Sequence, residues 1–250
     1  MNRPVTKTSV LGIPVSSKGV GDVEGLFSCK DAGESLTITF VNPLACALDI
    51  QHPEYTAVLE GFDIVTCDGI GMVKAAQSSG LTNVRRESFD YTSLAESVFA
   101  WAEKCGKEIG LIGGEAGVTK KAGVALSSKF PDLKIMACFS GFGHDPASAA
   151  EFFKENQTEL VICGMGAPLQ EQFVLNLVNS GWHGIGFTCG GFLDQVIVGE
   201  TYYPHLVDRL NIRFLYRLFK EPRRLWRRYL IEYQIFLKRY GRLQWNRLRA

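Results

Sequence analysis

The sequence predicts an α/β fold with an open, mostly parallel sheet, helices on both of its faces, and a basic helical appendage at the C-terminus. Three observations support this. Short β-branched runs alternate with longer segments of helical character. The runs are almost continuously apolar, which is typical of parallel strands buried on both faces. The composition also changes abruptly near residue 204.

Six apolar runs are the expected strands, each followed by Gly, Pro or Asn and then by a helical pattern. Right-handed crossovers would join them into a doubly wound, Rossmann-like sheet, whose ligands bind at the carboxyl ends of the strands. Two of the clearest helical segments are Val118–Phe130 and Leu169–Asn179. The expected strands are Leu36–Val41, Asp63–Cys67, Glu108–Ile112, Lys134–Cys138, Glu159–Cys163 and His183–Thr188.

The composition is that of a globular protein, with 250 residues, 46% hydrophobic and 21% charged. These values exclude wholesale disorder. No run reaches the roughly 18 to 20 apolar residues that span a bilayer. The polar N-terminus lacks the apolar core of a signal peptide, so we expect a cytoplasmic protein. The seven cysteines show no paired spacing, so we expect them to be small buried hydrophobic residues and not a disulfide framework.

Charge divides the chain into an acidic core, residues 1–204, and a basic appendage, residues 205–250. Fourteen of the 27 basic residues and 23 of the 26 acidic ones lie in the core, for a net charge of −9 there and +10 in the appendage. Ile212–Tyr240 has the pattern of two helices, with Pro222 as a breaker or first helical residue. Such asymmetry indicates an anionic surface or substrate as partner.

Asp68 follows the second expected strand and precedes Gly69 and Gly71. An aspartate at the carboxyl end of a strand can serve as a general base or contact a sugar hydroxyl. It can equally be a turn residue that caps the next helix, and the residues alone favour that plainer interpretation.

Glycine pairs follow three other expected strands. Gly113-Gly114, Gly164 with Gly166, and Gly190-Gly191 allow backbone amides to approach a phosphate, or simply form tight turns. None completes a dinucleotide-binding or P-loop motif. Gln170 and Glu171 lie in the first turn of the helix after Pro168, where they can contact a ligand. In the plainer interpretation, Gln170 is solvated and Glu171 complements the helix dipole.

The arginines of the appendage leave four interpretations open. They suit a diphosphate, an anionic membrane interface, a nucleic-acid backbone, or a solvated surface helix. The acidic core and the lack of a nucleic-acid motif argue against nucleic acid. The four histidines are scattered, so we expect no metal site and no cofactor.

Taken together, these motifs resemble the WecG/TagA/CpsF family of bacterial glycosyltransferases over nearly the whole chain. The features that carry the resemblance, in this order and spacing, are Asn42-Pro43, Cys67–Gly71, Leu111–Gly114, Phe130-Pro131, Gly164–Glu171, Gly190–Asp194 and Tyr216–Arg228.

The resemblance implies a metal-independent, inverting transferase on the inner face of the cell membrane. It would move a sugar from a UDP-sugar to a polyprenyl-diphosphate-linked sugar. Asp68 matches the proposed catalytic base of the family, and Asn42 and Gln170 match polar residues of its sugar site. Arg85 and Asp90 bound its R-x-x-G-x-D segment. Arg217, Arg224 and Arg227 match arginines thought to close over the diphosphate.

The chain departs from the family pattern in three places, of which the last bears on the donor. Phe40 stands where the family has the threonine of T-x-N, so the threonine contact is either missing or replaced by Thr39. Ser88 replaces a glycine. Tyr202-Tyr203-Pro204 replaces Arg-Ala-Pro, which argues against an N-acetylmannosamine donor and favours members that transfer glucose, as in xanthan-type exopolysaccharides.

The competing interpretation is a non-catalytic nucleotide-binding module tethered to a membrane by its basic tail. Such a module would share the glycine turns and the basic helix, but it would not require Asp68.

Overall fold

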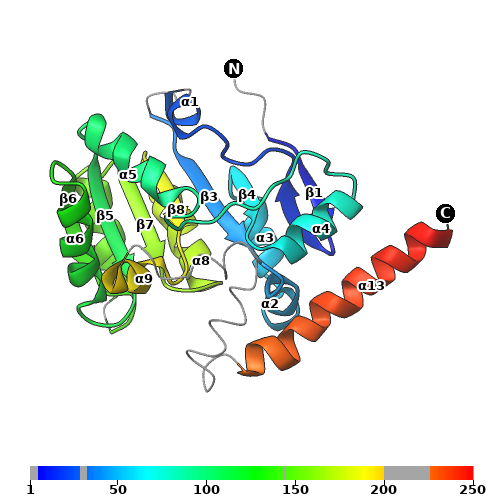
Figure 1. Ribbon diagram of the computed structural model, residues 1–250. Coiled ribbons are helices and arrows are strands. Elements are labelled where there is room, and N and C mark those ends of the chain that lie inside the picture. The colour runs from blue at the N-terminus through cyan, green and yellow to red at the C-terminus, as the bar shows by residue number, and fades with distance from the viewer. Residues whose placement is uncertain (1–4, 29–32, 144, 200–225, 250) are drawn as a thin grey trace.

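A six-stranded parallel sheet forms the centre of the molecule (Figure 1). A computed structural model describes residues 5–28, 33–143, 145–199 and 226–249. The strand order is β4-β3-β8-β7-β5-β6. All six predicted strands are present with ends within two residues of those expected, which confirms the α/β class. They are β3 (Leu36–Val41), β4 (Ile64–Cys67), β5 (Glu108–Gly113), β6 (Lys134–Phe139), β7 (Leu160–Gly164) and β8 (Ile185–Thr188).

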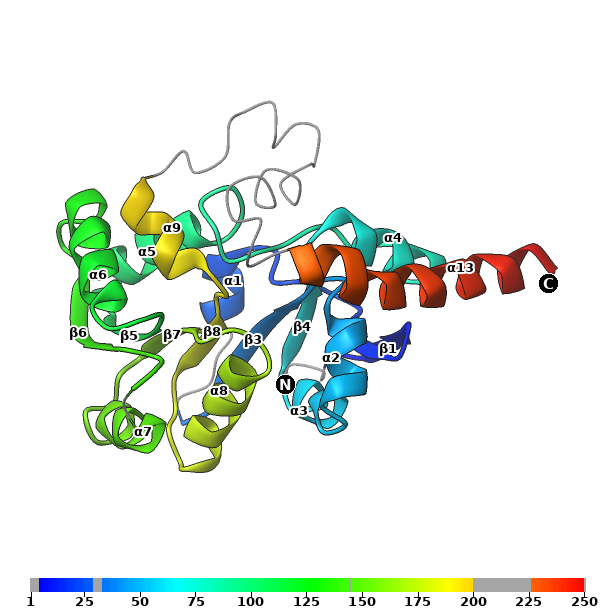
Figure 2. The same cartoon turned by 90° about the horizontal axis from the view of Figure 1, so that it is seen from below.

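Helices cover both faces of this sheet (Figure 2). The two segments that the sequence singled out are α6 (Val118–Lys129) and α8 (Leu169–Asn179), so both predictions are confirmed. The others are α1 (Val23–Ser28), α2 (Ala45–Gln51), α3 (Tyr55–Glu60), α4 (Ile70–Ser78), α5 (Ala95–Lys104), α7 (Pro146–Glu155) and α9 (Phe192–Val198).

The sheet has a hydrophobic core on each face, which explains why its strands are apolar throughout. In β7, Val161 and Cys163 join the core that contains residues of α7 and α8. Their neighbours Leu160 and Ile162 join the core that contains residues of α5, α6 and α9. Successive side chains of a strand point to opposite faces, so every position of such a strand is buried.

A short antiparallel hairpin precedes the sheet and was not predicted from the sequence. It consists of β1 (Lys7–Val10) and β2 (Ile13–Ser16), joined by Leu11 and Gly12, which both have positive φ. Four-residue strands are too short to give a clear periodic signal, and positive φ at both central residues is the turn geometry that suits hairpins. The Ser16 hydroxyl accepts a hydrogen bond from the Val65 amide of β4, at 2.9 Å.

The C-terminal helix α13 (Tyr233–Arg249) follows a π-helical turn at Arg228–Glu232 and runs alongside α2 and α4 (Figure 2). Two helices were expected within Ile212–Tyr240. Residues 212–225 of that range lie outside the described residues, and so does the domain boundary expected at residue 204. The described helix extends past Tyr240 to Arg249. No helix within the described ranges is long and apolar enough to cross a membrane.

Three side chains of α13 dock it onto the core. Phe236 is buried and packs against Gly71, at the start of α4. The Arg239 guanidinium donates to the Leu11 carbonyl and pairs with Asp49, both at 2.8 Å. The amide of Gln244 donates to the Ser78 hydroxyl at 2.7 Å.

We expect Phe236→Ala to lower the free energy of unfolding by about 3 kcal/mol, because it removes a buried ring. Urea denaturation measures this loss. The neighbouring Leu237 is 61% exposed and supplies the matched control, since Leu237→Ala should change stability by less than about 0.5 kcal/mol. Equal effects of the two substitutions would show that α13 does not depend on this contact.

Candidate functional site

A cavity of about 340 Å³ lies at the carboxyl edge of the sheet and collects residues that follow all six strands of the sheet. Ten of the residues singled out in the sequence line it: Asn42, Asp68, Asp90, Gly114, Gly164, Gly166, Gln170, Gly190, Gly191 and Asp194. This edge is where open α/β sheets bind their ligands.

Other expected site residues lie elsewhere. Thr39 and Glu171 are fully buried beneath the cavity wall, and Gly113 lies behind its floor. Arg85 is exposed and lines a different hollow. Arg227 is exposed before α13, whereas Arg217 and Arg224 lie outside the described residues.

The hollow lined by Arg85 is larger than the cavity, with a volume of about 610 Å³, and it lies between α1, α5 and the segment 85–94. It receives no residue from the carboxyl ends of the strands. We therefore take the smaller cavity as the functional site.

The floor of this cavity is built from backbone. A Cβ atom on Gly113 would lie 2.4 Å from the carbonyl oxygen of Gly164, and one on Gly164 would lie 2.8 Å from that of Gly190. Real Cβ contacts are never this short, so the ends of β5, β7 and β8 can approach only because these residues are glycine. This close approach explains Gly113 and Gly164, two of the glycines that the sequence singled out.

Asp68 directly follows β4, and its amide donates to the Val41 carbonyl at 2.8 Å, which continues the pairing of β3 with β4. Gly69 then turns the chain into α4 with a φ of 95°, a conformation that favours glycine. The Asp68 side chain is 37% exposed and lines the cavity. The turn therefore presents a carboxylate to any bound ligand.

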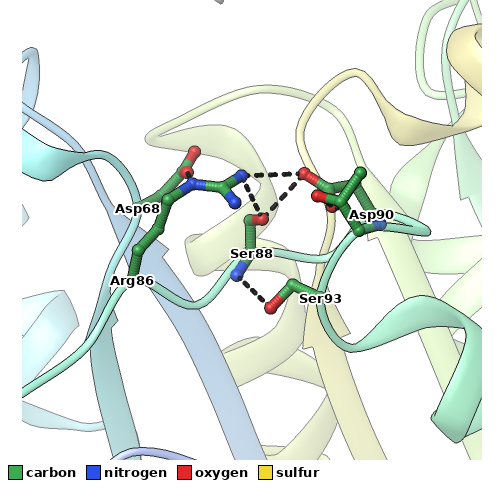
Figure 3. A network of polar contacts seen from close by, with 6 residues as sticks. Asp68, Arg86, Ser88, Asp90 and Ser93 are labelled. Atoms are coloured by element: carbon green, nitrogen blue, oxygen red, sulfur yellow. Dashed lines mark hydrogen bonds and ion pairs between the residues drawn. The ribbon is translucent and has the colours of Figure 1, made fainter. Parts of the chain in front are cut away.

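An arginine that the sequence analysis did not single out joins Asp68 and Asp90, two of the three aspartates that line the cavity (Figure 3). The Nε atom of Arg86 lies 3.6 Å from Asp68 Oδ1, and its Nη2 lies 3.0 Å from Asp90 Oδ2. The same Nη2 donates to the Ser88 hydroxyl at 2.6 Å, and that hydroxyl donates to Asp90 at 2.7 Å. Arg86 occupies an unspecified position of the R-x-x-G-x-D segment between Arg85 and Asp90, so its position in the fold, and not the motif, reveals it.

The buried carboxylate of Glu87 anchors the segment that carries Arg86. It accepts hydrogen bonds from the amides of Val20 and Gly21 and from the Thr66 hydroxyl, at 2.9 to 3.1 Å. The Glu87 amide also donates to the Cys67 carbonyl at 2.9 Å. These bonds hold the segment beside the end of β4, next to Asp68.

A second buried carboxyl, that of Glu171, lies under the opposite wall. Its Oε1 accepts from the Thr39 hydroxyl at 3.0 Å and from the Gln170 amide at 2.8 Å. Its Oε2 is buried without a hydrogen-bond partner. Burial raises the pKa of Glu171, and the two hydrogen bonds offset only part of this effect.

The comparison with known families shows to which family this chain belongs. The model of the WecG/TagA/CpsF family of glycosyl transferases matches residues 8–250. The chain belongs to this family. It is therefore a sugar-transferring enzyme, and the resemblance noted in the sequence is confirmed.

Two relatives illustrate the range of this glycosyltransferase family. A UDP-Gal:alpha-D-GlcNAc-diphosphoundecaprenol beta-1,4-galactosyltransferase of Shigella boydii is 31% identical over 208 residues, which cover 81% of this chain and 84% of the relative. An N-acetylglucosaminyldiphosphoundecaprenol N-acetyl-beta-D-mannosaminyltransferase of Bacillus subtilis (strain 168) is 29% identical over 194 residues, covering 77% and 74%.

The raised pKa of Glu171 predicts a specific dependence of stability on pH. An unfolded chain releases this proton as the pH rises past about 4.5, the ordinary value, while the folded chain retains it to a higher pH. The free energy of unfolding should therefore fall across that window. It should stop falling once the pH exceeds the folded pKa.

Glu171→Gln removes the titration and should flatten this part of the stability profile. The measurement is urea denaturation of both proteins from pH 4 to 8. The titratable neighbour on β7 is the Cys163 thiol, whose pKa burial raises well above its ordinary value of 9.0, so it stays neutral here. Parallel pH profiles of the two proteins would contradict the assignment.

Proposed function

We propose that this glycosyltransferase moves a neutral hexose from a UDP-hexose to a sugar carried on a polyprenyl diphosphate, with inversion at the anomeric carbon, in bacterial exopolysaccharide or cell-wall polymer synthesis. The observation that carries the proposal is the Asp68 carboxylate, which lines the cavity of a family member and is paired with Arg86. Both relatives described above have names that specify a diphosphoundecaprenol-linked sugar as acceptor.

The choice of a hexose without an N-acetyl group rests on two observations. The relative from Shigella boydii is named a beta-1,4-galactosyltransferase. Phe40 lines the cavity at the position where the family pattern has threonine, so an apolar ring stands in place of a hydroxyl there. UDP-galactose, UDP-glucose and UDP-N-acetylmannosamine offered in parallel test this choice, and a β-1,4-linked product from either hexose supports it.

Inversion requires a single displacement at the anomeric carbon. The acceptor hydroxyl oxygen attacks this carbon as the bond to UDP breaks, and Asp68 takes the hydroxyl proton. General-base catalysis of this kind typically contributes about 10²- to 10⁴-fold. Because the attacking oxygen becomes part of the glycosidic bond, the proton must leave during the step, and a cavity carboxylate can receive it.

The sugar needs donors and acceptors that hold it in line for this attack. The Asn42 side-chain oxygen accepts from the Leu44 amide at 2.9 Å, which leaves its Nδ2 hydrogens as donors to a ligand. Gln170 lines the same cavity from the first turn of α8. We assign to both residues the role of hydrogen-bonding the hydroxyl groups of the sugar.

Arginines would offset the negative charge that develops on the departing UDP. We assign this role to Arg217, Arg224 and Arg227, whose guanidinium groups match diphosphate oxygens. On this view the reaction needs no metal ion. Turnover that persists in EDTA supports the assignment, while loss on chelation that Mg²⁺ restores contradicts it.

We expect Asp68→Asn to reduce kcat by at least about 100-fold, because the amide keeps the shape of the side chain but cannot accept a proton. The assay is release of UDP in the presence of a short-chain polyprenyl-diphosphate sugar. UDP affinity, measured by calorimetry, should change little. A variant that retains kcat within about tenfold of the parent would exclude Asp68 as the base.

The appendage, residues 205–250, would bring the enzyme to the anionic inner face of the membrane that presents the acceptor. The described part of this segment carries exposed aromatic and aliphatic side chains together with exposed cations, a combination that suits a membrane interface. These side chains are Trp226, Arg227, Leu230, Leu237, Lys238, Arg242, Trp245, Arg247, Leu248 and Arg249.

We expect replacement of Arg242, Arg247 and Arg249 by Gln to weaken binding to anionic vesicles on the order of 100-fold, at about 1 kcal/mol per cation. Flotation with phosphatidylserine vesicles across a salt series measures this. The control replaces three exposed lysines of α6 and α7 by Gln, which changes the charge by the same amount. These lysines are Lys120, Lys121 and Lys154. Similar losses in both variants would show that overall charge, and not the appendage, is responsible.

A further inference from the structure

Four buried polar side chains meet under one wall of the cavity, and we call them the polar layer: Thr39 on β3, Thr188 on β8, and Gln170 and Glu171 on α8. All four are at most 5% exposed. Only Thr188 and Gln170 line the cavity, whereas Thr39 and Glu171 lie behind them.

The Gly190 amide determines the orientation of Gln170. A backbone N–H can only donate, so the atom that it meets at 3.1 Å is the side-chain oxygen of Gln170. The Nε2 atom of Gln170 consequently faces Glu171 and donates to Oε1 at 2.8 Å. One hydrogen of Nε2 remains available.

Glu171 determines the direction of the hydroxyl pair in the same way. Its Oε1 accepts the single hydrogen of the Thr39 hydroxyl at 3.0 Å. The contact of 2.8 Å between the Thr39 and Thr188 hydroxyls must then use the hydrogen of Thr188. Thr188 therefore has no hydrogen left for the cavity, and its oxygen can only accept.

We infer that Glu171 is a positioning residue that sets the donor and acceptor pattern of the cavity wall, so that this wall selects a sugar hydroxyl that donates to Thr188 and accepts from Gln170. This inference rests on the proposed function, because it takes the ligand of the cavity to be a sugar. It assigns no contact with the substrate to Glu171 itself.

A neutral carboxyl at position 171 suits this role. Within the described residues, no cation pairs with Glu171, and the titratable group that interacts with it is the Cys163 thiol on β7. Burial raises the pKa of Glu171, which favours the protonated form. A protonated carboxyl with its hydrogen on Oε2 keeps Oε1 as a carbonyl oxygen that accepts both hydrogen bonds, and a glutamine amide offers the same oxygen in nearly the same shape.

Three variants separate this role from simple packing. Glu171→Gln keeps the accepting oxygen, whereas Glu171→Met keeps the length of the side chain but removes the acceptor. Thr158→Val is the matched control, because it also removes a buried oxygen that has no partner, and Thr158 lies at the opposite edge of the sheet, just before β7.

The readout is selectivity between each sugar and its deoxyfluoro analogues, with one hydroxyl replaced at a time in the UDP-hexose and, separately, in the acceptor sugar. Fluorine cannot donate to Thr188. We expect the parent, Glu171→Gln and Thr158→Val to disfavour fluorine at one position by roughly 10- to 100-fold, as for a lost buried hydrogen bond. Glu171→Met should reduce this preference to within about threefold.

The two panels show whether the hydroxyl belongs to the donor or to the acceptor. The inference is overturned if Glu171→Met still prefers the hydroxyl over fluorine. It is also overturned if Glu171→Gln loses this preference as fully as Glu171→Met does. Should Glu171→Met fail to fold, Thr39→Val replaces it, because it frees the Thr188 hydrogen and should also remove the preference, while Thr39→Ser should restore it.

Donor affinities in the first panel are measured by calorimetry and do not depend on turnover. An active Asp68→Asn enzyme would therefore refute the proposed base without altering the binding result for Glu171. A parent protein that binds no UDP-hexose and uses no acceptor sugar would refute both proposals.

Discussion

The parallel pairing of β3 with β4 on one side and β8 on the other is the constraint on which the site depends. The register sets Val41 opposite Cys67 and Ile38 opposite Phe187. Asn42, Asp68 and the end of β8 consequently emerge at one edge, although more than 100 residues separate the first two from the third along the chain. Because side chains alternate between faces, a shift of one residue would turn Thr39 away from Glu171 and break the polar layer.

Two buried carboxyl groups support this edge by different physical means. Glu87 is surrounded by two amides and a hydroxyl that donate to it, and Arg85 lies at 3.4 Å. Glu171 has one oxygen with two donors and another with none, so burial favours its neutral form. The first group fixes the position of a loop, and the second fixes the direction of hydrogen bonds.

The docking of α13 links the basic appendage to the same edge of the sheet. Phe236 fills the space over Gly71, three residues after Asp68, and Pro43 lies beside it against the same glycine. Arg239 fastens the helix to α2 through Asp49. The helix that we propose to face an anionic surface is thereby attached beside the carboxylate assigned as the base.

The sequence alone was sufficient for the sheet, because a strand buried on both faces must be apolar at every position, and for the family, because its motifs occur in a distinctive order. It also located the turns that carry Asn42 and Asp68 and the start of the helix that carries Gln170, since glycine and proline mark the ends of strands. The β1–β2 hairpin was not predicted from the sequence, because a strand of four residues is too short to show a clear periodic pattern. Only the tertiary structure could place Arg86 between Asp68 and Asp90, send Arg85 to another surface, and bury Thr39 and Glu171 under the wall. Local patterns specify which face of an element is apolar, whereas a polar contact depends on where distant segments meet, and the packing of the whole sheet decides that.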